Sequence, residues 1–105
     1  MATQVQTGQA GEAAAVAALK SEGWTITSWN TQAPGSTDIE AASGSKKLLV
    51  QVKSAVAPQS PGSLSSDEER NIKSRASRIG ADAYEARVTL DQNLVATQVD
   101  WRKLT

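Results

Sequence analysis

The chain has 105 residues, enough for one domain with a modest core, and its 11 acidic and 11 basic residues leave no formal net charge. It contains neither Cys nor His, which excludes disulfides, thiolate or imidazole metal ligands and a Ser-His-Asp triad. Catalytic chemistry would have to come from carboxylates, Lys, hydroxyls and amides, and a bound metal would be a hard cation.

The sequence shows no signal for a membrane or for export. No apolar run approaches the roughly 18 residues of a spanning helix, and the first twenty residues lack the basic-then-apolar order of a secretory signal. We therefore expect a cytoplasmic protein with no membrane partner. Because the net charge is zero, any nucleic acid would have to be held by a local patch.

The first predicted element is an Ala-rich helix over 8–22, with Thr7 as its N-cap and Gly23 as its stop. Glu12 lies four residues before Val16, on the apolar stripe of this helix. An acid on a buried stripe needs a reason, although a negative charge near a helix start is common.

Three strands are predicted next, over 24–29, 37–42 and 47–54. Gly44 and Ser45 suit a two-residue type II′ turn between the second and third strands. If they form it, the numbers of opposed residues sum to 89.

This register predicts two faces for the hairpin, because side chains alternate along a strand. The residues expected on the polar flank are Asp38, Glu40, Leu49, Gln51 and Lys53. The residues expected on the apolar flank are Ile39, Ala41, Leu48, Val50 and Val52.

Three segments are predicted to lie outside helices and strands. Residues 1–7 are expected to be flexible, 31–36 to form a loop, and 55–64, rich in Pro, Gly and Ser, to form a mobile connection.

A second helix is predicted from a capping box of Ser66 and Glu69 to Ile79, before Gly80. Its inner stripe is expected to hold Ile72, Ala76 and Ile79. Strands over 82–90 and 94–101 follow, joined by a turn at 91–93. The predicted fold is a single α/β domain of order α-β-β-β-α-β-β.

Two short motifs give this order a family resemblance. The first helix carries Gly-x-x-Gly-Glu at Gly8, Gly11 and Glu12, and the hairpin carries Asp-Ile-Glu-Ala from Asp38 and Val-Gln-Val-Lys ending at Lys53. This core, roughly residues 8–54, resembles the PD-(D/E)xK nuclease superfamily. The likeness is nearest to archaeal-type Holliday junction resolvases and small bacterial proteins of YraN type.

The resemblance implies a restriction-endonuclease-like core, a mixed sheet flanked by two helices, and a metal-dependent endonuclease acting on DNA, with branched or junction DNA favoured. It implies Mg²⁺ or Mn²⁺ as cofactor and a homodimer as the working unit. The implied catalytic residues are Asp38, Gln51, Lys53 and Glu12. The implied metal ligands are Asp38, Gln51, the backbone carbonyl of Val52 and Glu12, with Glu40 as a further acid on the same flank.

Gln51 departs from the commonest motif, which has a carboxylate at this position. A neutral amide oxygen lowers the charge of the ligand set, so the affinity for a cation should fall. Some branches of the superfamily, including Mrr-like restriction enzymes, also have Gln-x-Lys, and Glu40 can supply the missing charge.

Basic residues predict a nucleic-acid path on either side of this flank. Lys46 and Lys47 would lie at the hairpin tip, and Arg70 and Lys73 on the second helix. The alternative is a solvated surface balanced by the acids at 67–69.

Two other interpretations remain open. The chain can be a nuclease-fold protein without turnover that binds DNA or assembles a complex, or a small interaction module with no nucleic-acid role. Taken singly, Asp38 would cap a turn, Lys53 would protect a strand edge and Glu12 would complement the helix dipole.

Overall fold

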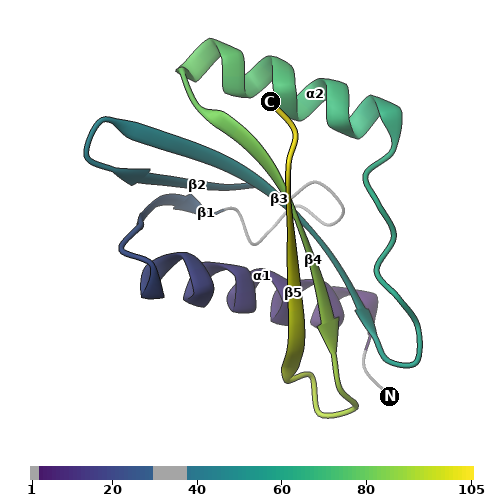
Figure 1. The fold of residues 1–105 in the computed structure, drawn as a ribbon. Coiled ribbons are helices and arrows are strands. Elements are labelled where there is room, and N and C mark those ends of the chain that lie inside the picture. Colours follow the sequence, from purple (N-terminus) through teal and green to yellow (C-terminus); the bar gives the residue numbers. More distant parts are fainter. Residues whose placement is uncertain (1–2, 30–37) are drawn as a thin grey trace.

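The computed structural model describes residues 3–29 and 38–105, with Asp38 described by its backbone alone. One five-stranded mixed sheet, in the order β1-β2-β3-β4-β5, lies between two helices (Figure 1). The elements are α1 (Gln4–Ser21), β1 (Thr25–Trp29), β2 (Asp38–Ser43), β3 (Lys46–Val56), α2 (Ser66–Ile79), β4 (Asp82–Leu90) and β5 (Ala96–Lys103). The predicted α/β class and element order are confirmed.

Helix α1 begins four residues earlier than predicted. Thr3 is its N-cap, and a capping box with Gln6 satisfies free amides at the helix start. Thr7 is therefore inside the helix, and residues 4–7, expected to be flexible, belong to it. The C-terminal end agrees with the prediction, since Gly23 follows the helix with a positive φ of 92°.

The β2–β3 hairpin has the predicted register. Asp38 pairs with Gln51 and Ser43 with Lys46, so opposed residue numbers sum to 89 throughout. Gly44 takes a φ of 61° in the two-residue turn, as the first position of a type II′ turn requires. The loop predicted at 31–36 lies outside the described residues.

The two faces of the sheet carry separate cores. One face packs against the Ala, Val and Leu stripe of α1, and this core consists of Ala15, Val16, Leu19, Ile39, Ala41, Leu48, Val50 and Ala86. The other face packs against α2, and its core consists of Leu49, Leu64, Ile72, Ala76 and Ala83. Even-numbered residues of β3 therefore face α1 and odd-numbered residues face α2.

Helix α2 makes the crossover that brings β4 parallel to β3. Its N-cap is Ser65 and its capping box uses Glu68, one residue before each predicted position. Ile72 and Ala76 are buried as predicted, but Ile79 is 36% exposed. Ile79 is the last residue of the helix, beyond the part that covers the sheet.

The connection from β3 to α2 is held to β4, although residues 55–64 were expected to be mobile. The Arg87 guanidinium donates two hydrogen bonds to the Pro61 carbonyl, and the Leu64 N–H donates to the Glu85 carboxylate. These bonds fix the position from which α2 starts.

Neither helix can cross a membrane. In the described part of the chain, no helix is both long enough and apolar enough to span a bilayer.

Candidate functional site

The predicted polar flank is present on the α2 side of β3. Gln51 is 4% exposed, and the Lys53 side chain is 31% exposed. The two residues are neighbours on one face because they are two positions apart on an extended strand. Both side chains reach the same partner, the Glu68 carboxylate in the first turn of α2.

Glu68 uses its two oxygens for different purposes. Oε1 accepts the Ser65 N–H at 3.0 Å and completes the capping box, while Oε2 accepts from Lys53 Nζ at 2.8 Å. Gln51 Nε2 lies 3.4 Å from the same Oε2 atom. The hydrogen bond from Lys53, followed by that from the Ser65 N–H, holds the pKa of Glu68 below its usual value. The carboxylate is therefore ionised at neutral pH.

Glu85 forms a second acidic position on this face. It is the register partner of Gln51 on β4 and is fully buried. Its Oε2 accepts from Arg102 Nη2 at 2.9 Å and from the Leu64 N–H at 3.0 Å. Burial alone would raise the pKa of Glu85, but these hydrogen bonds outweigh it and lower the pKa. Glu85 is thus a buried anion that joins β4, β5 and the start of α2.

Glu12 lies in the other layer of the molecule. It is buried on the inner stripe of α1, as predicted, and neighbouring Gly11 packs against Val52 and Ser54 on the α1 face of β3. The structure therefore does not bring Glu12 into the flank of Gln51 and Lys53. The reason is geometric: the apolar stripe of α1 packs on the apolar flank of the hairpin, so an acid on that stripe faces away from the polar flank.

The other predicted ligands lie along the same hairpin. Asp38 is the first residue of β2 and occupies the register position opposite Gln51. Glu40 is two residues further, opposite Leu49, and is partly buried. Val52 packs with its side chain against the α1 core; its carbonyl remains a predicted ligand.

A hard cation suits some of these residues. Gln51 Oε1 is buried and has no hydrogen-bond partner among the described residues, and such an oxygen can gain by coordinating an ion. Oε1 of Glu12 and Oε1 of Glu85 are also buried and have no hydrogen-bond partner among the described residues. No group of three or more acidic side chains that could hold a metal occurs within residues 3–29 and 39–105.

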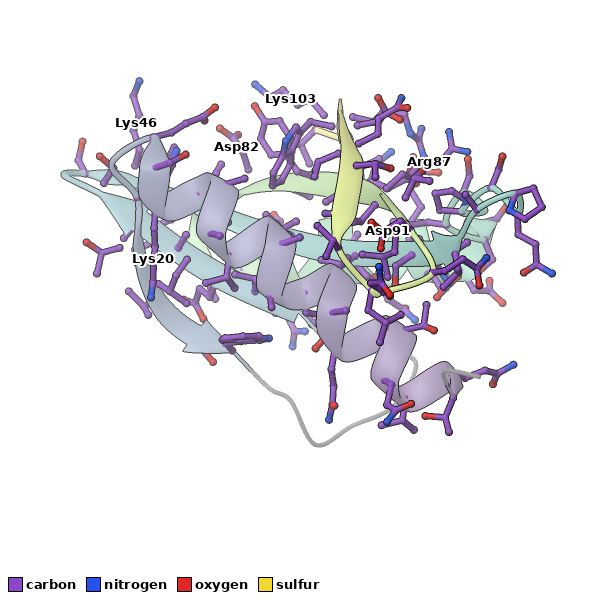
Figure 2. The ribbon with its side chains drawn as sticks, turned by 90° about the horizontal axis from the view of Figure 1, so that it is seen from below. Lys20, Lys46, Asp82, Arg87, Asp91 and Lys103 are labelled. Carbon is purple, nitrogen blue, oxygen red and sulfur yellow. The ribbon has the colours of Figure 1, made fainter. Side chains whose placement is uncertain are left out.

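The predicted nucleic-acid residues differ in their surroundings. Lys46 and Lys47 are exposed at the β2–β3 tip, and Figure 2 shows Lys46 toward the same end of the molecule as Lys20, away from Arg87 and Asp91. Arg70 and Lys73 are exposed but pair with acids one turn earlier on α2, Arg70 with Asp67 at 3.2 Å and Lys73 with Glu69 at 3.8 Å.

Sequence reasoning missed the residues that surround Lys53 and Gln51. The predicted capping box, Ser66 with Glu69, lies one residue late and does not include Glu68. Glu85 and Arg87 occupy alternate positions of β4, with buried Ala86 and Val88 on the opposite face, and this alternation is a usable signal for polar residues on one face.

Comparison of the chain with protein-family models, with curated proteins and with solved structures finds no significant match.

Proposed function

We propose that this protein is a metal-dependent endonuclease that hydrolyses DNA phosphodiester bonds at the polar flank of the β2–β3 hairpin. The observation that carries the proposal is the strand register, with Asp38 opposite Gln51 and Lys53 two residues further on the face of Gln51. This is the order of acid, ligand position and lysine in the PD-(D/E)xK nucleases that the sequence resembles.

Each residue has a distinct chemical task in this proposal. Asp38 and Gln51 provide oxygen ligands for Mg²⁺ or Mn²⁺, which when bound supplies Lewis acidity and a more acidic water. The ammonium group of Lys53 balances the negative charge that builds on the phosphate during hydrolysis. Glu12, buried in the α1 layer, has no part in this arrangement.

The substrate proposed is branched or junction DNA, and the working unit proposed is a homodimer. A junction presents two related strands for cleavage, and a two-fold dimer would present two sites in matching orientation. Exposed Lys46 and Lys47 at the hairpin tip are the proposed phosphate contacts.

A second function, DNA binding without cleavage, is favoured by one specific contact. Lys53 already has an anionic partner, Glu68 Oε2 at 2.8 Å, and the Gln51 amide lies against the same oxygen. In an inactive protein these three groups would be a closed structural network. DNA would then be retained without a divalent cation, and Lys53→Ala would leave retention unchanged.

The deciding experiment is a cleavage assay on duplex, forked and four-way DNA with Mg²⁺ or Mn²⁺. Asp38→Asn and Lys53→Ala are each compared with a surface variant of the same charge type, Glu22→Gln and Lys20→Ala. The proposal expects cleavage by the wild type and both surface variants, and its loss in Asp38→Asn and Lys53→Ala. Cleavage at the same rate by all five proteins would assign the activity to another site.

A further inference from the structure

The first turn of α2 brings a carboxylate against the side-chain amide of Gln51, whose buried Oε1 has no hydrogen-bond partner among the described residues. Glu68 cannot swing freely, because its Oε1 is held by the Ser65 N–H and its own N–H is held by Ser65 Oγ. Its Oε2 is therefore presented to β3 by the helix cap. Glu12 cannot take this place because it lies in the α1 layer.

The spacing between Gln51 and Glu68 suits two ligands of one ion. The contact of Gln51 Nε2 with Glu68 Oε2, at 3.4 Å, is long for a hydrogen bond. A half-turn of the amide would put Gln51 Oε1 at that distance from the carboxylate oxygen. An ion about 2.4 Å from each of two oxygens with this separation would have a ligand–ion–ligand angle of about 90°. For Mg²⁺, whose ligand distance is about 2.1 Å, the same angle requires an oxygen–oxygen separation of about 3.0 Å, which is only slightly shorter.

In the structure, Lys53 donates a hydrogen bond to Glu68 Oε2, the oxygen that would bind the ion. Its Nζ is 2.8 Å from Oε2, and its side chain is 31% exposed. A partly exposed lysine has the reach to leave this contact and point its ammonium group elsewhere. The Lys53–Glu68 pair is thus compatible with an exchange of partners.

We propose that Glu68, instead of Glu12, supplies the carboxylate that Gln51 lacks, so that Gln51 and Glu68 are ligands of one cation at the polar flank. Lys53 gives up its hydrogen bond to Glu68 when the site is filled and turns to the substrate phosphate. This inference rests on the proposed function, because it assigns a ligand of the same site.

The test is Mn²⁺ binding, measured from the paramagnetic resonance signal of the free ion without DNA. Glu68→Gln should weaken binding by about tenfold or more, because it removes a ligand charge. Gln keeps the helix cap, since Gln6 performs that role in α1. Glu12→Gln and Glu69→Gln are the matched controls and should bind as the wild type does. Lys53→Met should bind Mn²⁺ more tightly, because it removes the cation that competes for Glu68.

The outcomes separate this inference from the proposed function. Unchanged binding by Glu68→Gln, or equal weakening by Glu12→Gln, overturns the role of Glu68, while cleavage by the wild type that depends on Asp38 and Lys53 leaves the endonuclease proposal standing. Weaker binding by Lys53→Met overturns the exchange of partners. A wild type that binds no Mn²⁺ at millimolar concentration overturns both proposals.

Discussion

Lys53 Nζ on β3 and Glu68 Oε2 on α2 are 2.8 Å apart, and the same carboxylate caps the helix through its other oxygen. One side chain thus couples the start of α2 to the polar flank of the hairpin. The connection before α2 is in turn held by Arg87, which donates to the Pro61 carbonyl, and by Glu85, which accepts from the Leu64 N–H. A shift of that connection would move Glu68 away from Lys53.

Acid should reveal this contact as a loss of stability. The pKa of Glu68 in the folded protein lies below its ordinary value of 4.5, chiefly because of Lys53. The unfolded chain therefore binds a proton more readily, so the stabilisation is complete above the ordinary pKa and disappears as the pH falls through the lowered value.

Lys53→Met removes the first cause of this shift and keeps an apolar stem. Urea unfolding of wild type and variant at neutral pH and at decreasing pH below the ordinary pKa of 4.5 should show a stability difference that shrinks in acid. The pKa of Glu85 is also lowered, so acid removes its contribution to stability in both proteins alike, and this effect cancels from the comparison. A difference of equal size at both pH values would show that the ion pair does not stabilise the fold.

The glycines of the first helix provide a matched pair. A Cβ added at Gly11 would lie 2.5 Å from Ser54 Cβ, whereas one added at Gly8 would meet nothing within 4 Å. Gly8→Ala should therefore stabilise the protein by up to about 1 kcal/mol through helix propensity. Gly11→Ala should destabilise it by about 1–3 kcal/mol, because α1 or β3 must shift. Thermal or urea unfolding measures both, and an equal gain from the two substitutions would be inconsistent with this packing.

The two acids that contact Arg102 should differ sharply in their contribution to the free energy of unfolding. Glu85 is fully buried and 2.9 Å from Arg102 Nη2, while Glu69 is 29% exposed and lies 3.5 Å from Nη1. Glu85→Ala would leave the Leu64 N–H without its acceptor and open a cavity, so it should cost about 2–4 kcal/mol. Glu69→Gln should cost less than about 1 kcal/mol. The comparison is made by urea unfolding, and similar costs for both would mean that Glu85 is not the anchor of α2.

The local pattern of the sequence was sufficient for the hairpin and insufficient for the relation between layers. Gly44, the alternation around it and the count of residues specified which side chains share a face. The local pattern could not predict whether Glu12 reaches the polar flank of the hairpin, because the face of the sheet that a helix covers depends on the whole sheet. The apolar stripe of α1 nevertheless indicates which face the helix covers, because an apolar stripe packs against the apolar flank of the hairpin.

The cap of α2 shows a second limit. Ser65 and Ser66 are adjacent, and each is followed by an acid three residues later, Glu68 and Glu69, so both registers satisfy the capping-box pattern. In the structure Ser65 is the cap, and with it Glu68 contacts Lys53 and Glu69 contacts Arg102. Sequence alone could not decide a difference of one residue that changes which acid faces the site.

The location of the bound cation tests the central claim most directly. In a ¹⁵N-labelled protein, Mn²⁺ at substoichiometric concentration should broaden first the amide signals of Asp38, Gln51 to Lys53 and the first turn of α2, together with the side-chain amide of Gln51. The account would be contradicted by Mn²⁺ that broadens first the signals around Asp91 or the outer face of α2, or by signals that stay sharp at millimolar Mn²⁺.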